Sequence, residues 1–244
     1  MKVTLTRITE EPILAIEEAA SNCYDSKPTQ DGKIMKHCIQ SGHTSVTEFT
    51  TFTFHIEGVT RALLAQLTRH RHASYAVRSQ RYCDEDGFGY VIPPSIKNNA
   101  EAEHIYTALI GYIGMQYKKL QNMGIPNEDA RYVLPNACET TLEFSINLRS
   151  FMNMCNERLC SRAQWEIRAL VKEMVKLVVE QVPQLKPYLV PKCEKYGKDM
   201  AFCPEGRRNC CGRHTVLSDI FKDYNRYQDI RLVKQSEWED YNND

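Results

Sequence analysis

Two stretches far apart in the chain alternate apolar and polar side chains, and this pattern limits the possible folds more than any other. Such a two-residue period is typical of β-strands, whose successive side chains point to opposite faces. Each stretch therefore predicts a strand, one near residues 51–56 and one over 140–148. The apolar positions are Phe52, Phe54 and Ile56 in the first, and Leu142, Phe144, Ile146 and Leu148 in the second.

Apolar residues at helical spacing predict helices in much of the rest of the chain. A further short strand is expected over residues 2–8, whereas 191–213 are irregular and a polar tail begins at Val216. The pattern predicts one α/β domain with few strands, followed by a C-terminal appendage. The helices are expected near residues 13–20, 33–40, 59–67, 105–120, 126–135, 150–158 and 167–178.

A basic run from Arg69 to Tyr82 carries four arginines and two histidines in fourteen residues. The whole chain nevertheless has 31 Lys and Arg against 31 Asp and Glu, so the positive charge is local. Because the guanidinium fork binds phosphate oxygens in pairs, the run favours a site for a phosphate or a nucleotide. A nucleic-acid-binding module stacking bases on Tyr75 and Tyr82 is the alternative, although such domains are normally basic throughout.

The run resembles the signature of the flavin-dependent thymidylate synthases, which is Arg-His-Arg followed after seven residues by Ser. Here the signature is Arg69-His70-Arg71 and Ser79, and the similarity extends over roughly residues 1–185. The flanking segments that match are Gly42-His43 with Glu48, Gln66, Arg131 to Pro135, Asn147 to Asn153, and Arg158 with Ala163 to Ile167.

This resemblance implies an α/β (α+β) fold with a mixed or antiparallel sheet flanked by helices. Residues 1–190 would form the single core domain, and residues 191–244 a Cys-rich C-terminal extension. The implied enzyme is a homotetramer with active sites at subunit contacts. It would convert dUMP to dTMP with methylenetetrahydrofolate as carbon donor, and NADPH would reduce a bound FAD that supplies the hydride.

The resemblance also assigns roles to residues. Arg158 and Ser79 hold the catalytic positions, with Arg158 expected to stabilise negative charge on the uracil ring. Ser79 is not expected to attack as a nucleophile, because no His/Asp pair is evidently arranged to activate it. Positions for FAD are held by His43, Arg69, His70, Arg71, Asn147, Arg149 and Asn153, and positions for dUMP by Gln66, Ser79, Gln80, Arg81, Arg131 and Arg158.

One departure from the family pattern leaves a second enzymatic function open as an alternative. Many relatives carry Glu or Gln two residues before the signature serine, whereas this chain has Val77. The change removes one side-chain hydrogen bond to the nucleotide, which Arg78 or the backbone would have to replace. A flavoprotein of the same fold that acts on another nucleotide or a pterin is therefore the alternative.

The cysteines of the extension pose a separate question. Cys193, Cys203, Cys210 and Cys211 lie within nineteen residues, with His214 nearby. No Cys-x-x-Cys pair is present, so the sequence indicates no metal site with any strength. A structural zinc and a disulfide both stay open as hypotheses.

The chain has no apolar run of the length that a transmembrane helix requires. Its first residues also lack the apolar core of a signal peptide. We therefore expect a cytoplasmic protein with neither a membrane nor a nucleic acid as its partner.

Overall fold

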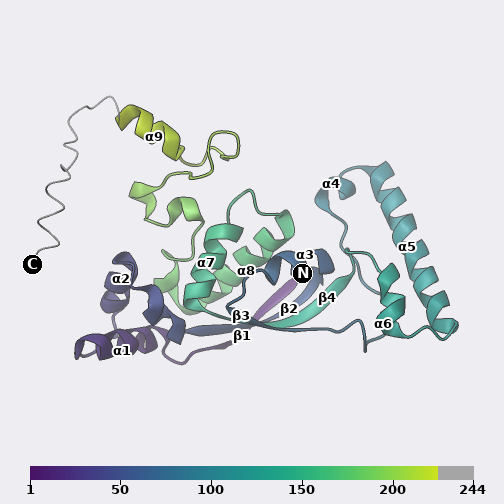
Figure 1. Cartoon of the computed structure of the whole chain (residues 1–244), viewed down its shortest axis with the longest axis horizontal. Coiled ribbons are helices and arrows are strands. Elements are labelled where there is room, and N and C mark those ends of the chain that lie inside the picture. Colours follow the sequence, from purple (N-terminus) through teal and green to yellow (C-terminus); the bar gives the residue numbers. More distant parts are fainter. Residues whose placement is uncertain (225–244) are drawn as a thin grey trace, which may run out of the picture. The chain divides into compact units, whose positions relative to one another are not determined.

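The computed structural model describes residues 1–224 and divides into two units, residues 1–191 and 192–244 (Figure 1). The part of the expected extension beyond residue 224 lies outside the described residues. In chain order the first unit contains β1 (Lys2–Ile8), α1 (Pro12–Tyr24), α2 (Lys33–Gln40), η1 (Thr44–Phe49), β2 (Thr51–Thr60), α3 (Arg61–Leu67), β3 (Ala73–Val77), α4 (Pro94–Lys97), α5 (Ala100–Asn122), α6 (Asn127–Ala130), η2 (Arg131–Val133), β4 (Glu139–Asn147), α7 (Leu148–Arg158), α8 (Trp165–Gln181) and η3 (Pro183–Leu185).

A four-stranded antiparallel sheet in the order β1-β2-β4-β3 forms the centre of this unit. Phe54 of β2 lies opposite Phe144 of β4, and the alternate residues along both strands are buried. Helices α7 and α8 cover the sheet (Figure 1), and Phe151 of α7 packs against Phe52 and Phe54 with ring centroids 5.8 and 6.0 Å away. The expected α/β fold with an antiparallel sheet flanked by helices is confirmed.

Two local predictions need correction. The helix expected from residue 59 begins at Arg61, because β2 continues to Thr60 and buries Val59 in the sheet. Gly58 lies at an irregularity in the pairing between Glu57 and Val59 with a φ of 67°, a backbone conformation that glycine adopts readily. Strand β3 was not predicted, since its residues lie inside the basic run.

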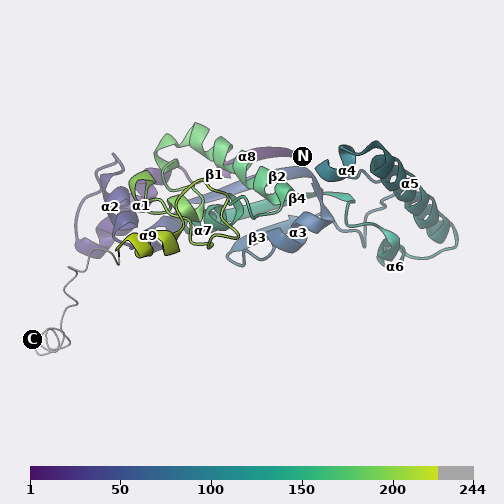
Figure 2. The same cartoon turned by 90° about the horizontal axis from the view of Figure 1, so that it is seen from above.

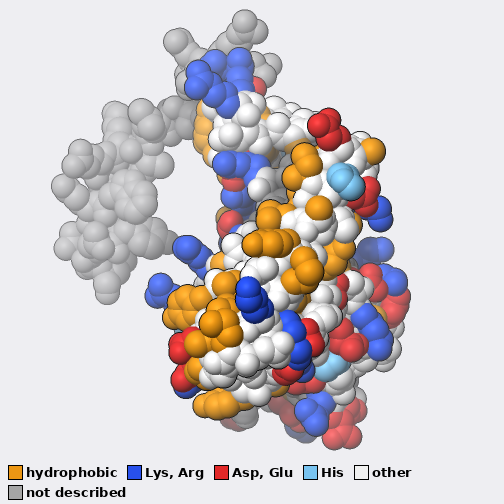
Figure 3. All heavy atoms as spheres, turned by 90° about the vertical axis from the view of Figure 1, so that its right-hand side faces the viewer, with side chains coloured by type: hydrophobic (Ala, Val, Ile, Leu, Met, Phe, Trp, Pro, Cys, Tyr) orange, Lys and Arg blue, Asp and Glu red, His pale blue; other side chains and the backbone are white. Residues whose placement is uncertain are grey.

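Helix α5 stands at one end of the sheet, opposite α1 and α2 in both views (Figures 1 and 2). Within the described residues, one apolar side of this helix is exposed, whereas Ile113 and Leu120 are partly buried. Ile105, Leu109, Tyr112 and Met115 are 61, 54, 55 and 63% exposed. Hydrophobic side chains gather on the face of the molecule that is turned to the viewer in Figure 3. Large apolar surfaces of this kind mark contacts with other molecules.

A buried carboxylate joins α8 to the start of α3. Glu166 is 4% exposed, and its two oxygens accept hydrogen bonds from the amide and the hydroxyl of Thr60 at 2.7 and 2.6 Å. The same hydroxyl accepts from the amide of Leu63 at 3.0 Å and so caps α3. Glu166 therefore holds in place the helix that leads into the basic run.

We expect Glu166→Ala to lower the free energy of unfolding by about 3 kcal/mol, because the amide of Thr60 would be left buried without its acceptor. Urea unfolding measures the change. The matched control is Glu173→Ala on the same helix, whose half-exposed carboxylate pairs with Lys176. It should change stability by less than about 0.5 kcal/mol. Equal losses for the two variants would refute the role given to Glu166.

The second unit has little regular structure in its described part. It contains η4 (Lys192–Glu194), η5 (Lys198–Met200) and α9 (Leu217–Tyr224), and Cys203 forms a parallel bridge with Val216. The sequence pattern indicated a polar tail from Val216, so α9 was not predicted.

Candidate functional site

The end of α7 meets the end of α3, and three of the predicted site residues come together there. Arg158 donates from Nε to Nε2 of His70 at 3.0 Å and from Nη2 to the carbonyl of Gln66 at 3.2 Å. These residues are 88 and 92 positions away from Arg158 in the sequence. The two contacts fix the plane of the guanidinium and leave its other N–H groups available. We call Arg158, His70 and Gln66 the Arg158 group.

The imidazole of His70 is held in its neutral form. Burial, followed by the nearby charge of Arg158, lowers the pKa of His70 from 6.5 to about 4. Because Nε2 accepts the bond from Arg158, the proton of the neutral ring lies on Nδ1. The phenol oxygen of Tyr75 lies 2.8 Å from the carbonyls of both Leu67 and His70, which ties β3 to this turn.

The lowered pKa of His70 predicts a pH dependence of stability. The unfolded chain takes up this proton near pH 6.5 and the folded chain only near pH 4, so the unfolded state binds more protons between these values. The free energy of unfolding should therefore fall as the pH drops through this window.

Urea unfolding at about pH 7 and about pH 4.5 measures the effect. We expect His70→Gln to reduce the pH-dependent loss by about 2 kcal/mol, since glutamine offers Arg158 an acceptor that does not titrate. His104→Gln, at an exposed position of α5, should leave the loss unchanged. An unchanged loss in His70→Gln as well would contradict the assignment of a neutral His70.

A second group of predicted residues lies where α7 begins, beside η1. Arg149 pairs with Glu48 of η1 at 2.5 Å. Asn153 lies one turn further along α7 and is exposed, so it shares a face with Arg149. Asn147 accepts from the amide of Ser150 and thereby caps α7, and His43 is exposed at the start of η1. We call His43, Asn147, Arg149 and Asn153 the Arg149 group.

A third group lies beyond β3. Arg81 binds Oε2 of Glu128 through Nε and Nη2 at 3.1 and 3.0 Å, and Arg131 donates to the carbonyl of the same Glu128 at 3.0 Å. The hydroxyl of Ser79 accepts from the amide of Arg81 at 3.3 Å. Glu128 was not predicted, because no motif connects it to Arg81 across 47 residues. We call Ser79, Gln80, Arg81 and Arg131 the Arg81 group.

Gln80 lies in this group through a different contact. Its side-chain amide donates to the sulfur of Cys138 at 3.6 Å, and burial raises the pKa of that thiol to about 11. The amide is thus held against the start of β4, whereas Arg81 and Tyr82, the next two residues, are exposed.

The groups remain separate within one chain. β3 lies between His70 and Ser79, and its five residues span about 13 Å. Among the described residues, no hydrogen bond or ion pair joins the Arg81 group to the Arg158 group. Arg69 and Arg71, also predicted at the site, are exposed on the turn between α3 and β3.

Val77 lies at the edge of the hydrophobic core. Its side chain packs against the buried cluster, and Arg78 points into a different network. Arg78 bonds Glu85 at 3.1 Å and the carbonyl of Asp84 at 3.0 Å, and Glu85 is buried. Arg78 is therefore already engaged, and it is not available to replace the hydrogen bond that Val77 cannot make.

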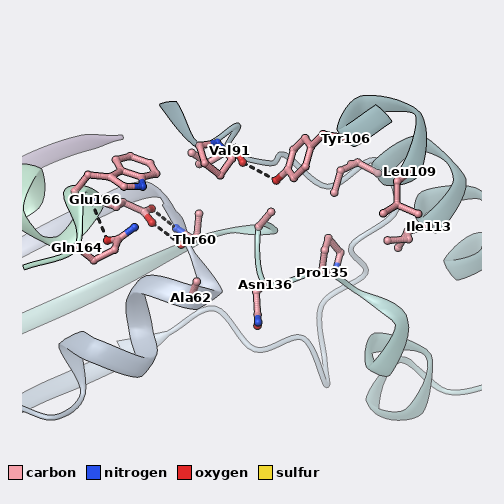
Figure 4. A pocket seen from close by; sticks show the side chains of 14 residues that line it. Thr60, Ala62, Val91, Tyr106, Leu109, Ile113, Pro135, Asn136, Gln164 and Glu166 are labelled. Carbon is pink, nitrogen blue, oxygen red and sulfur yellow. Dashed lines mark hydrogen bonds between the residues drawn. The ribbon is translucent and has the colours of Figure 1, made fainter. Parts of the chain in front are cut away.

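A cavity of about 360 Å³ lies between α5, the start of α3 and the start of α8 (Figure 4). Its wall is mainly apolar and includes Leu109, Ile110 and Ile113 of α5. None of the predicted site residues lines it. The cavity is therefore an apolar pocket beside α5, and the basic residues predicted for the site do not line it.

Comparison with known proteins identifies the family. A family model described as Thy1, thymidylate synthase complementing protein, matches residues 4–184. The chain belongs to the Thy1 family. The flavin-dependent thymidylate synthase of Nitratidesulfovibrio vulgaris is 37% identical over 242 residues, which cover 90% of this chain and 97% of that protein. That of Clostridium tetani is also 37% identical, with 91% of this chain and 97% of that protein covered.

Solved structures of the family have the same fold. The flavin-dependent thymidylate synthase of Helicobacter pylori, complexed with FAD and dUMP, matches with a TM-score of 0.63 and 26% identity. The match covers 79% of this chain and 99% of that one. The predicted family, the flavin-dependent thymidylate synthases, and with it an enzyme of the transferase class, is confirmed. No helix among residues 1–224 has the length and apolar character needed to cross a membrane.

Proposed function

We propose that this Thy1 family member converts dUMP to dTMP, with methylenetetrahydrofolate as carbon donor and NADPH as reductant. The observation that carries the proposal is the Arg158 group, in which two hydrogen bonds fix a guanidinium at the end of α7. Its relatives are named flavin-dependent thymidylate synthases, and the Helicobacter pylori enzyme is described with FAD and dUMP.

The residues near the basic run suit a dinucleotide such as FAD. Arg69, Arg71 and His43 are exposed donors, and guanidinium forks fit the oxygens of a diphosphate. We assign His43, Arg69, His70, Arg71, Asn147, Arg149 and Asn153 to FAD. FAD held by these residues would, when reduced by NADPH, supply the hydride for the reaction.

The chain's own residues would bind dUMP and stabilise its charge. Arg81 and Arg131 are suited to the phosphate, which would compete with Glu128 for Arg81. Arg158, oriented by neutral His70, would stabilise negative charge on the uracil ring as hydride adds. Gln66, Ser79 and Gln80 complete the proposed dUMP positions, with Ser79 acting through its hydroxyl as a hydrogen-bonding group.

The separation of the three groups of site residues supports the assembly of several copies of the chain into an oligomer. One chain does not bring the Arg81 group to the Arg158 group, whereas a site between copies can combine groups from different subunits. The exposed apolar stripe of α5 is the surface expected at such a contact. We therefore propose a homotetramer with active sites at subunit contacts, working in the cytoplasm.

A visible absorption spectrum tests the binding part of the proposal. The full chain is saturated with FAD, desalted and then titrated with dUMP. A retained flavin spectrum that shifts on addition of dUMP supports both sites together. Loss of the flavin on desalting would contradict the proposal, and a tight, salt-sensitive affinity for nucleic acid would then favour the nucleic-acid-binding alternative.

The environment of Val77 favours one second candidate, a flavoprotein of this family that acts on another nucleotide or a pterin. Val77 packs on the core and Arg78 is engaged by Glu85, so the missing hydrogen bond to the nucleotide is not replaced by either side chain. Retained flavin without any response to dUMP would support this candidate.

A further inference from the structure

Few apolar side chains are buried in the part of the second unit that the structure describes. Among residues 192–222, the buried apolar side chains are those of Cys203 and Val216. Units this small normally need a cross-link such as a disulfide or a metal ion. The unit is also rich in cysteine, which supplies the ligands for either.

Three potential ligands meet in this unit. The sulfur of Cys193, a carboxylate oxygen of Glu194 and a ring nitrogen of His214 all lie within 4.8 Å of one another. All three side chains are partly buried. Ligand atoms around a tetrahedral zinc lie about 3.5 Å apart, so small side-chain rotations would close the site.

The backbone holds these ligands together. Phe202 donates its amide to the carbonyl of Cys193 at 3.0 Å, and Cys203 donates to the carbonyl of Thr215 at 2.8 Å. Three short segments of this unit thus lie side by side, and Cys193 and His214 belong to two of them. Backbone hydrogen bonds between these segments therefore hold the three ligands near one another.

Cys210 is not one of these three residues, but its thiol contacts the backbone of His214. The thiol donates to the carbonyl of His214 at 3.5 Å, and its sulfur accepts a hydrogen bond from the amide of Gly212 at 3.3 Å. Cys211, the next residue, is exposed.

We propose that Cys193, Cys210 and His214, together with Glu194, hold a structural zinc ion. Thiolate and imidazole ligands select zinc over magnesium or calcium, and four protein ligands make a closed, structural site. Binding releases the thiol protons and breaks the present 3.2 Å contact between Nε2 of His214 and Oε1 of Glu194. The zinc cross-links the described part of this unit, in which few apolar side chains are buried, and keeps that part folded.

Metal analysis of the full chain, purified without chelator and dialysed, tests the proposal. We expect about one zinc per chain. Cys193→Ser, Cys210→Ser and His214→Ala should each lower this content at least tenfold. The matched control is Cys211→Ser, at the neighbouring exposed thiol, which should keep the zinc. Zinc below a tenth of the chain concentration, or zinc unchanged in Cys193→Ser, would overturn the proposal.

A measurement on the unaltered chain covers the case in which the variants fail to fold. Alkylation followed by mass spectrometry should modify Cys193 and Cys210 at least tenfold faster after a chelator has removed the metal. Cys23 on α1 is exposed and should react equally fast before and after. Thiols that become reactive only after a reductant is added would show a disulfide and would overturn the proposal.

Discussion

Replacing Arg158 with alanine is expected to lower turnover of dUMP at least a hundredfold while FAD stays bound. Its guanidinium is fixed through Nε by His70 and through Nη2 by the carbonyl of Gln66, where the end of α7 meets the end of α3. Removing one such preorganised donor typically costs a factor of about 10² to 10³ in rate. Initial rates of dTMP formation and the flavin spectrum of the same samples measure both parts of the prediction.

Two further variants separate charge from geometry at this position. Arg158→Lys keeps the charge but cannot reproduce both contacts, so it should recover little of the lost rate. The control is Arg168→Ala on α8, whose guanidinium bonds the carbonyl of Ser161 and belongs to none of the three groups. It should keep nearly full activity. If Arg158→Ala released FAD and left dUMP binding intact, the role assigned to Arg158 would be wrong.

A charge placed on the apolar stripe of α5 should dissociate the proposed homotetramer and abolish activity. Tyr112 is 55% exposed in the single chain, within the stripe formed by Ile105, Leu109 and Met115. In Tyr112→Glu, the carboxylate would have to be buried without a partner at the subunit contact, which costs several kcal/mol. We expect the mass in solution to fall from that of a tetramer to that of smaller species. Light scattering after size-exclusion chromatography measures it.

Activity and flavin binding should be lost together in Tyr112→Glu, because the proposed sites combine residues from different copies. This joint loss distinguishes the variant from Arg158→Ala. Thr107→Glu is the control, since it adds the same charge to an exposed position roughly 140° around the same helix. A Tyr112→Glu protein that stays tetrameric would show that the stripe is not the contact.

The sequence predicted those helices and strands that bury one face and expose the other, because burial of one face produces a regular apolar period. The two-residue period of Phe52, Phe54 and Ile56 is the direct consequence of a strand packed on one side, as found in β2. The error at Val59 has a local cause. The irregularity at Gly58 breaks the two-residue alternation, so that Val59 is buried in place of residue 58. Val59 and Leu63 are then two buried residues four positions apart, a spacing that is typical of a helix. β3 was missed because alanine, serine and the edge position give it a weak pattern.

The site was predictable in its composition but not in its arrangement. The resemblance supplied the residues of all three groups, yet the contact between Arg158 and His70 joins positions 88 residues apart. No periodicity connects such positions, and only the packing of α7 beside α3 brings them together. The neutral state of His70 follows from burial, which the sequence does not reveal. The ion pair between Arg81 and Glu128 also depends on tertiary structure, because no sequence pattern connects the two residues.

Formation of dTMP in a defined mixture tests the central claim most directly. The full chain is incubated with FAD, dUMP, methylenetetrahydrofolate and NADPH, and the nucleotides are separated by chromatography. We predict dTMP in the complete mixture and a loss of product when any one of the four components is left out. Absence of dTMP from a preparation that has bound FAD and dUMP, or its formation without FAD, would contradict the account.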